Sequence, residues 1–402
     1  MQVVSPSIAS QMAGGSWIRR MFEAGIELKR QHGAERVFDF SLGNPDLPPP
    51  AAVQAALRAI ADDLDRPMAL GYMPNAGYPE VRARLAAHLA AEQASPVRAE
   101  HVVLTCGAAG AINAFFRAVL SPGDEVLCPA PYFVEYGAYA GNFGGVLKTV
   151  PSRRLTFEPD LAGLAAALTP RTRAVIVNSP NNPTGVVYGA EVLRGIAALL
   201  EKHSAAVGRP VYLISDEPYR FLTYDGVTVP PILPLYAFSV VVGSFSKNLS
   251  LAGERVGYFL ANPAMPEVDQ LMAAVTMTNR MLGFVNAPAL GQRLMAAALE
   301  SGVDVGVYRG RRDAMARVLD AAGLRYCLPQ GAFYMFPEAP YGLDDKAFVD
   351  LLLEQRVLAV PGTGFGYPGF FRLAFCVDEA VIERSAESFR AAVAAAKAQA
   401  GR

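Results

Sequence analysis

One lysine stands where its amine could act as a nucleophile. Lys247 lies between two short apolar runs, 239–242 and 255–260, each typical of a buried strand. On a tight loop between such strands a lysine loses water, its pKa falls, and the neutral amine can form a Schiff base with a carbonyl group. Taken alone, the sequence Ser-Phe-Ser-Lys favours an ordinary solvated turn, so other residues must decide between the two interpretations.

Three further polar residues could contact an aromatic ring system. Asp216 follows the apolar run 210–214, and a carboxylate buried there needs a cationic partner or several hydrogen-bond donors. A protonated pyridine nitrogen would serve as the cationic partner. Asn182 and Tyr219 could both donate a hydrogen bond to a phenolate-like oxygen. Structural interpretations stay open: Asp216 could cap a helix or pair with a cation, and Asn182 could serve only the turn 182–185.

Two features could hold a phosphate. Gly107, Ala108 and Ala109 lie at the predicted start of a helix, where backbone N–H groups and the positive end of the helix dipole favour an anion. Arg255 could clamp the same group through two hydrogen bonds, or it could merely pair with an acid. Strand-to-helix turns often carry glycine for steric reasons, so neither feature is specific by itself.

A repeated order of strand, turn and helix positions these residues. Continuous apolar strands separated by helices predict a mainly parallel sheet that is covered on both faces. Polar residues gather just after each strand, at the carboxyl edge where open α/β sheets bind ligands. The predicted strands are 101–105, 125–128, 173–177, 210–214, 239–242 and 255–260.

The pattern changes after about residue 290, which indicates a second domain. We expect a large α/β domain over 46–290 and a smaller α+β domain built from 1–45 and 291–402. The smaller domain is predicted to contain helices at 304–322, 345–356 and 378–399, with strands at 333–336 and 371–375.

Composition excludes several classes of protein. The net charge of −1 argues against a nucleic-acid surface or a polybasic membrane patch. Four scattered cysteines and four distant histidines predict no metal site and a reducing, cytoplasmic environment. We also expect no secretory signal and no membrane-spanning helix, because no apolar run is long enough.

Taken together and in this order, the motifs resemble those of the pyridoxal-phosphate-dependent aminotransferases of fold type I, class I/II. The resemblance extends from 42–46 to 371–373, and its most specific parts are 182–185, 216–219, 244–247 and 255–258. It implies pyridoxal phosphate (PLP) as cofactor and a large domain with a mainly parallel, seven-stranded sheet flanked by helices. A departure is that Ala108 and Ala109 stand where many relatives have Ser or Thr.

The resemblance also implies a role for each residue. Lys247 would form the Schiff base and move the Cα proton, while Asp216 would keep the ring nitrogen protonated. Asn182 and Tyr219 would contact the ring oxygen, and Phe133 would stack on the ring. The remaining implied residues are Gly107, Ala108, Ala109, Ser244, Ser246 and Arg255 for the phosphate, Tyr72 for the phosphate of a partner subunit, and Gly43, Asn182 and Arg372 for the substrate.

The implied function is transfer of an amino group between an L-amino acid and a 2-oxo acid. A 2-oxoglutarate-type acceptor and aspartate or another small amino acid as donor are expected, in a homodimer with shared active sites. A PLP-dependent C–S lyase is the alternative on the same fold, whereas a PLP-sensing transcription regulator would need a DNA-binding domain for which there is no room. Arg280 would read a side-chain carboxylate, and Asn182–Pro183 and Ala130–Pro131 are candidate cis peptides.

Overall fold

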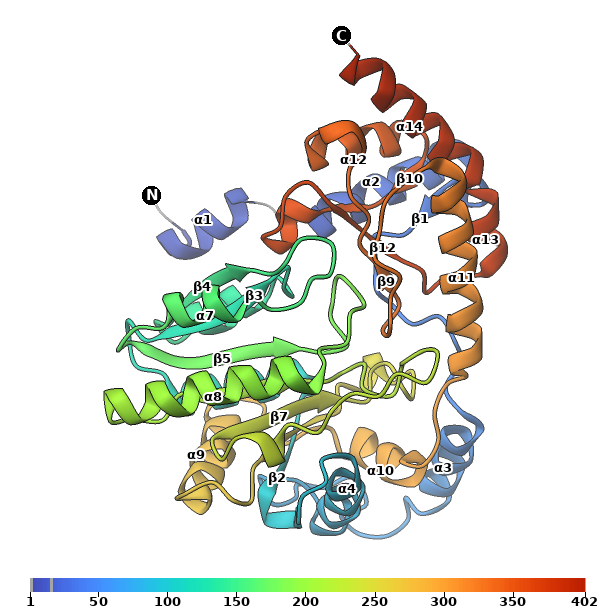
Figure 1. Ribbon diagram of the computed structural model, residues 1–402. Coiled ribbons are helices and arrows are strands. Elements are labelled where there is room, and N and C mark those ends of the chain that lie inside the picture. The colour runs from blue at the N-terminus through green and yellow to red at the C-terminus, as the bar shows by residue number, and fades with distance from the viewer. Residues whose placement is uncertain (1–2, 15–16, 402) are drawn as a thin grey trace. The chain divides into compact units, whose positions relative to one another are not determined.

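The computed structural model describes residues 3–14 and 17–401, which form two compact units (Figure 1). The larger unit comprises Pro45–Val305 and Gln330–Ala332, and the smaller one the chain up to Asn44, Gly306–Pro329 and the chain from Phe333 on. Residues 291–305 thus belong to the larger unit, although the sequence placed them in the smaller domain. The reason is packing: α10 (Ala289–Ala298) contacts α3 (Ala51–Asp62) and α4 (Pro79–Glu92) of the larger unit.

A seven-stranded sheet forms the centre of the larger unit, in the order β2-β8-β7-β6-β5-β3-β4. All neighbouring strands are parallel except that β8 is antiparallel to both β2 and β7, which confirms the predicted mainly parallel α/β sheet. Edge strand β4 was not predicted because most of its side chains are at least partly exposed. The strands are β2 (Val102–Thr105), β3 (Glu125–Ala130), β4 (Val146–Pro151), β5 (Thr172–Asn178), β6 (Tyr212–Asp216), β7 (Ser239–Ser244) and β8 (Gly257–Ala261).

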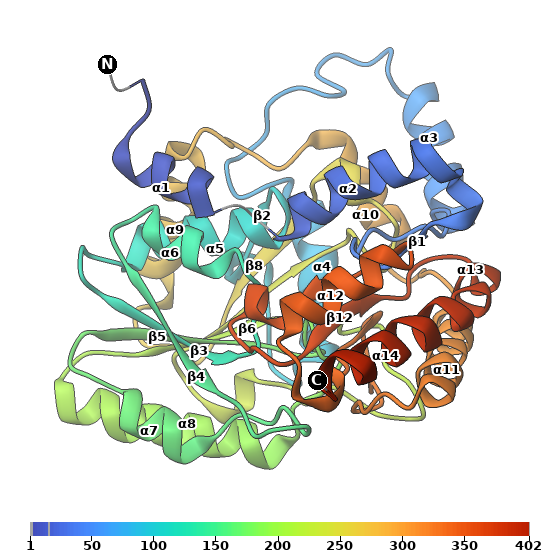
Figure 2. The ribbon, with the colours of Figure 1, turned by 90° about the horizontal axis from the view of Figure 1, so that it is seen from above.

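Helices cover both faces of this sheet (Figure 2). On one face α5 (Gly107–Val119) packs on β7 and β8, with α9 (Val268–Met281) and α6 (Tyr136–Gly141) against it. On the other face lie α7 (Leu161–Ala167) and α8 (Ala190–Val207). Phe115 of α5 forms the centre of the first interface, because its ring meets Tyr212 edge-on at 5.1 Å and stacks on Phe259 at 5.3 Å.

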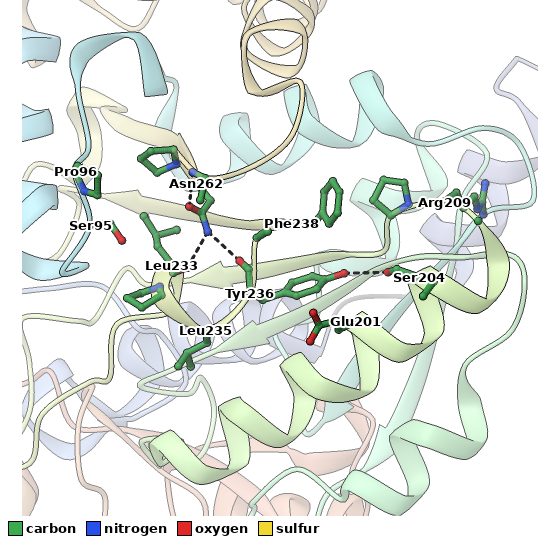
Figure 3. Close-up of a pocket in the computed structure, with 17 residues that line it drawn as sticks. Ser95, Pro96, Glu201, Ser204, Arg209, Leu233, Leu235, Tyr236, Phe238 and Asn262 are labelled. Atoms are coloured by element: carbon green, nitrogen blue, oxygen red, sulfur yellow. Dashed lines mark hydrogen bonds between the residues drawn. The ribbon is translucent and has the colours of Figure 1, made fainter.

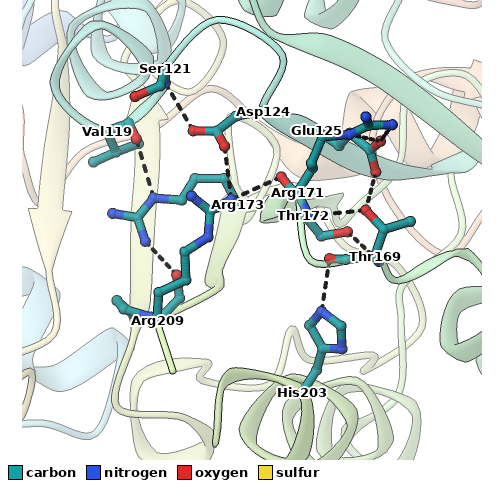
Figure 4. Close-up of polar contacts among 11 residues, drawn as sticks. Val119, Ser121, Asp124, Glu125, Thr169, Arg171, Thr172, Arg173, His203 and Arg209 are labelled. Carbon is teal, nitrogen blue, oxygen red and sulfur yellow. Dashed lines mark hydrogen bonds and ion pairs between the residues drawn. The ribbon is translucent and has the colours of Figure 1, made fainter. Parts of the chain in front are cut away.

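Ion pairs connect neighbouring strands at the amino edge of the sheet (Figure 4). Glu125, the first residue of β3, accepts hydrogen bonds from Arg171 at 3.1 Å and from the Thr169 hydroxyl at 2.7 Å. The Lys148 ammonium lies 2.8 Å from the same carboxylate. Asp124 pairs with Arg209 at 2.8 Å. The starts of β3, β4 and β5 are therefore linked by charged groups that satisfy one another.

The smaller unit contains short strands and longer helices. β1 (Phe38–Asp39) pairs in parallel with β10 (Val357–Leu358), and β12 (Phe371–Ala374) lies between β11 (Val360–Pro361) and β9 (Tyr334–Met335). The single helix predicted over 378–399 is two helices, because the Ser385 hydroxyl bonds to the Ile382 carbonyl where the first one ends. The helices of this unit are α1 (Pro6–Gly14), α2 (Trp17–His32), α11 (Val305–Ala322), α12 (Asp345–Glu354), α13 (Glu379–Arg384) and α14 (Ala386–Ala400).

Within residues 3–14 and 17–401, none of the helices combines the length and apolar character that crossing a membrane requires. Over the same residues, no group of three or more His, Cys, Asp or Glu side chains could hold a metal ion.

Candidate cofactor site

The carboxyl ends of two neighbouring strands, β5 and β6, bring polar side chains together. β5 ends in Asn178 and β6 in Asp216, and the pairing register places these two residues side by side. The Asn178 amide donates to the Asp216 carbonyl at 2.9 Å, and its oxygen accepts from the Asn182 N–H at 2.7 Å. Asn178 thus fixes the predicted residue Asn182 next to Asp216. Sequence analysis did not identify Asn178, because the register between the strands decides its position.

Asp216 is a buried carboxylate with one satisfied oxygen and one free oxygen. The Tyr136 hydroxyl donates to Oδ2, whereas Oδ1 has no hydrogen-bond partner among the described residues. Burial raises the pKa of Asp216 to about 7, although the bond from Tyr136 opposes this shift. A buried, unsatisfied carboxylate oxygen is costly unless a donor reaches it. The protonated ring nitrogen of PLP is such a donor, so the site fits this cofactor.

Tyr136 is a second site residue that sequence analysis missed. It begins α6 and is fully buried, and its ring meets that of Phe133 edge-on at 5.5 Å. Phe133 is therefore placed beside the partner of Asp216, as a ring-stacking residue would need to be. The only available signal was the spacing of three residues between two aromatics at the start of a helix.

The structure corrects one of the two expected cis peptides. Ala130–Pro131 is cis, as predicted, but the second cis bond is Ser179–Pro180 and not Asn182–Pro183. Pro183 instead lies within a tight turn that the Gly185 N–H closes by donating to the Asn181 carbonyl at 2.8 Å. An ordinary trans proline fits the interior of such a turn.

Helix α5 begins next to Arg255. A Cβ atom built at Gly107 would lie 3.0 Å from the Arg255 guanidinium, so this cation lies against the first turn of the helix. A Cβ atom at Gly257 would lie 2.6 Å from the Gly107 carbonyl carbon, which means that only glycine permits this approach of β8. The first N–H groups of a helix have no partners within it. Together with Arg255 they form a seat for an anion.

Lys247 lies in the turn that follows β7. Ser244 is the last residue of that strand and is paired with Gly257, so the turn starts beside the seat for the anion. Ser246 is buried, and Lys247 is half-buried rather than solvated as on an ordinary surface turn. Tyr219, in the turn after Asp216, is also buried.

Two residues that were predicted to bind the substrate, Arg372 and Gly43, lie next to the same tyrosine in the smaller unit. Arg372 is 3% exposed, its guanidinium carbon lies 4.9 Å from the ring centres of both Tyr334 and Phe365, and it donates to the Ser41 carbonyl. Gly43 lies against Tyr334 so closely that a side chain at this position would overlap the tyrosine hydroxyl. Gly43 and Arg372 therefore share the neighbour Tyr334.

Tyr72 and Arg280 are not among the residues that converge on Asp216. Tyr72 is 85% exposed on the loop between α3 and α4, and Arg280 is exposed in the last turn of α9. A role for either in the site requires a second chain or another arrangement of these segments.

A cavity of about 800 Å³ lies at the amino edge of the same sheet, before β6 and β7 (Figure 3). Asn262 at its wall donates to the carbonyls of Leu233 and Tyr236 at 2.8 and 2.9 Å. The Tyr236 hydroxyl bonds to Ser204 and to the Val211 carbonyl, both at 2.9 Å. These polar groups already satisfy one another, in contrast to Asp216 at the opposite edge.

The family described as aminotransferase class I and II matches residues 35–389. The chain belongs to the class I and II aminotransferases. This aminotransferase is 36% identical over 375 residues to aspartate/prephenate aminotransferase of Thermus thermophilus, which covers 90% of this chain and 92% of that protein. It is 32% identical to aspartate aminotransferase of Thermotoga maritima, which covers 88% of this chain and 90% of that protein.

Solved structures give the same result for the fold. An aminotransferase from Eubacterium rectale has a TM-score of 0.94 at 37% identity and covers 98% of both chains. Aspartate aminotransferase from Thermus thermophilus with maleate has a TM-score of 0.86 at 31% identity, and it covers 98% of this chain and all of the other. The predicted fold and cofactor are confirmed: the protein is a PLP-dependent transaminase with amino acid and 2-oxo acid substrates.

Proposed function

We propose that this enzyme transfers the amino group of aspartate, or of another small amino acid, to a 2-oxoglutarate-type acceptor. The free, buried Oδ1 of Asp216 carries the proposal for the site, because a protonated ring nitrogen is the partner it lacks. The names of the Thermus thermophilus and Thermotoga maritima relatives support aspartate as a donor. When bound, PLP supplies an electron sink that makes the substrate Cα–H acidic.

The side chains at the carboxyl edge would divide the work as follows. Asp216 would hold the ring nitrogen protonated, and Asn182 and Tyr219 would donate to the ring oxygen. Lys247 would attach the cofactor and would move the proton at Cα as the general base. Phe133 packs on the ring, and the phosphate is held by Gly107, Ala108, Ala109, Ser244, Ser246 and Arg255.

Arg372 and Gly43 would bind the α-carboxylate of the substrate. The planar guanidinium of Arg372 matches a carboxylate through two parallel hydrogen bonds and stays charged although it is buried. The rings of Tyr334 and Phe365 hold it in one orientation. Gly43 leaves room beside Tyr334 because it has no side chain.

A panel assay tests this function. Purified enzyme is incubated with PLP, 2-oxoglutarate and single amino acids, and glutamate formation is measured. We expect glutamate from aspartate or a small amino acid. Release of pyruvate and ammonia from a sulfur-containing amino acid without any 2-oxo acid would show the C–S lyase instead.

We also propose a cytoplasmic homodimer in which each subunit completes the site of the other. Tyr72 is 85% exposed, and the nearby apolar side chains Met68 and Leu70 are 76% and 51% exposed, as expected for a surface that a second copy covers. All four cysteines are free thiols, which suits a reducing compartment. Arg280 would reach the substrate side chain of the partner.

Subunit mixing tests the shared site. Lys247→Ala subunits are mixed with subunits that carry Tyr72→Phe and Arg280→Ala, each inactive or weak alone. A shared site predicts that mixed dimers regain activity, since one site then has all three native side chains. Re-associated mixtures that stay inactive, while mass spectrometry shows that subunits have exchanged, would mean that the sites are self-contained.

A further inference from the structure

A second buried carboxylate directly follows Asp216. Glu217 is 4% exposed, and its carboxylate is the acceptor in each of the hydrogen bonds described for it. Ser215 donates to Oε1 at 2.6 Å, while Gln93 and Arg220 donate to Oε2, each at 2.9 Å. The amide N–H of Gln93 and the guanidinium N–H of Arg220 cannot accept a proton, so this arrangement fits the ionised form of Glu217.

Arg220 joins three segments of the larger unit. Besides Glu217, its guanidinium donates to the carbonyls of Glu92 and Val229, both at 2.9 Å. The side chain of Gln93 extends the same link, because its oxygen accepts from the Ile232 N–H at 3.0 Å. The turn after β6, the end of α4 and the segment 229–232 are thus held together at one buried point.

Glu217 and Asp216 are adjacent negative groups within a buried region. Burial raises the pKa of Glu217, and Arg220 and Ser215 oppose that shift. Glu217 in turn contributes to the raised pKa of Asp216. Glu92, 3.8 Å from Arg220, and Tyr258 of β8 also act on this cluster. On the side of Asp216 the titratable neighbours are Tyr136, Tyr139 and Cys128. Without a cation here, two neighbouring buried carboxylates could not both be ionised at moderate cost.

We propose that Arg220 is a positioning residue for the cofactor: it neutralises Glu217, so that Asp216 can present its charge to the ring nitrogen, and it fixes the turn that carries Tyr219. This inference rests on the proposed roles of Asp216 and Tyr219. Arg220 acts through these residues and does not itself contact the ring.

The test measures how tightly the full-length enzyme binds PLP at pH 6 and pH 8. Arg220→Met removes the cation and leaves Glu217 with its two neutral donors, Ser215 and Gln93. Loss of the cation raises the pKa of Glu217 further, and the carboxylate is charged to a greater extent at pH 8 than at pH 6. We therefore expect PLP affinity to fall about tenfold or more at pH 8 and less at pH 6. The double variant Arg220→Met/Glu217→Gln removes both charges and should restore most of the affinity at pH 8.

Two results would overturn the proposal: wild-type affinity in Arg220→Met at both pH values, or an equal loss in the single and the double variant. If Arg220→Met does not fold, the double variant decides, since near-wild-type PLP affinity supports the electrostatic role and a tenfold loss refutes it. Arg220→Lys, which keeps the charge, should stay closer to wild type than Arg220→Met. Asp216→Asn serves as the separate control: if it leaves PLP binding and turnover unchanged, the proposed function of Asp216 is wrong whatever Arg220 does.

Discussion

Two buried carboxylates at opposite edges of one sheet have opposite electrostatic surroundings. Glu125, where β3 begins, contacts Lys148 at 2.8 Å and Arg171 at 3.0 Å. Burial raises the pKa of Glu125, but the hydrogen bonds from Lys148, Thr169 and Arg171 outweigh burial, so the pKa lies below its usual value. Asp216, where β6 ends, accepts only from neutral donors in the described part of the chain, and its Oδ1 has no partner there. Burial raises its pKa to about 7.

The difference separates a carboxylate that links strands from the carboxylate to which we assign the cofactor. At the amino edge the chain provides the cations itself, so nothing further is needed (Figure 4). At the carboxyl edge the side-chain donors to Asp216 are neutral, which leaves the carboxylate costly until a cationic ligand arrives. Both side chains are buried carboxylates, so the groups that surround each one account for the difference.

The largest effect is expected at the carboxyl edge, from Lys247→Ala. Loss of both the attachment point and the base should reduce turnover on the order of 10³-fold or more. PLP should still bind without a covalent bond, because the phosphate seat and Asp216 remain. Turnover and borohydride reduction check this, since reduction should fix PLP to wild type and not to the variant. Reduction that fixes PLP to a different lysine of the wild type would refute the assignment.

The next effect is the pH dependence of the cofactor-free protein. The pKa of Asp216 is raised from its ordinary value of 3.8 to about 7 in the folded protein. The stability that the protonated side chain contributes is therefore present below about pH 4 and is lost as the pH rises through 7. Three pKa units correspond to about 4 kcal/mol at most. Cofactor-free Asp216→Asn should therefore gain stability over wild type between pH 4 and pH 8, in urea unfolding at both values. If the free energies of unfolding of the two proteins change with pH in parallel, ionisation of Asp216 does not destabilise the folded protein.

The smallest effect is expected at the amino edge, from Glu125→Gln. Removing this carboxylate leaves Lys148 and Arg171, which are exposed enough to be solvated, so we expect a loss of about 1–2 kcal/mol of stability. Thermal unfolding measures the loss, and kcat should stay at the wild-type value. A Glu125→Gln enzyme with normal stability but impaired turnover would contradict the structural role that we assign to Glu125.

Much of the site could be predicted from the sequence, because its residues lie at the ends of strands and at the start of a helix, which local sequence patterns indicate. Apolar runs indicated the strands, and Asp216, Ser244 and Lys247 were expected just after them. In the structure Asp216 and Ser244 are the last residues of β6 and β7, and Lys247 lies in the turn that follows β7. The helix start at Gly107 followed from its small residues after a strand. These features depend on local periodicity and on the chirality of α/β units, which the order of residues specifies.

By itself, then, the sequence determined the strand-turn-helix order and the chemical identity of the residues at the carboxyl edge. The tertiary structure decided the rest: the register that puts Asn178 beside Asp216, the approach of Tyr136 from α6, and the link from Arg220 to α4. It also placed α10 in the larger unit and left Oδ1 of Asp216 without a partner within residues 3–14 and 17–401. Such pairings join residues tens of positions apart, and they form because packing brings whole elements together, which no local pattern records.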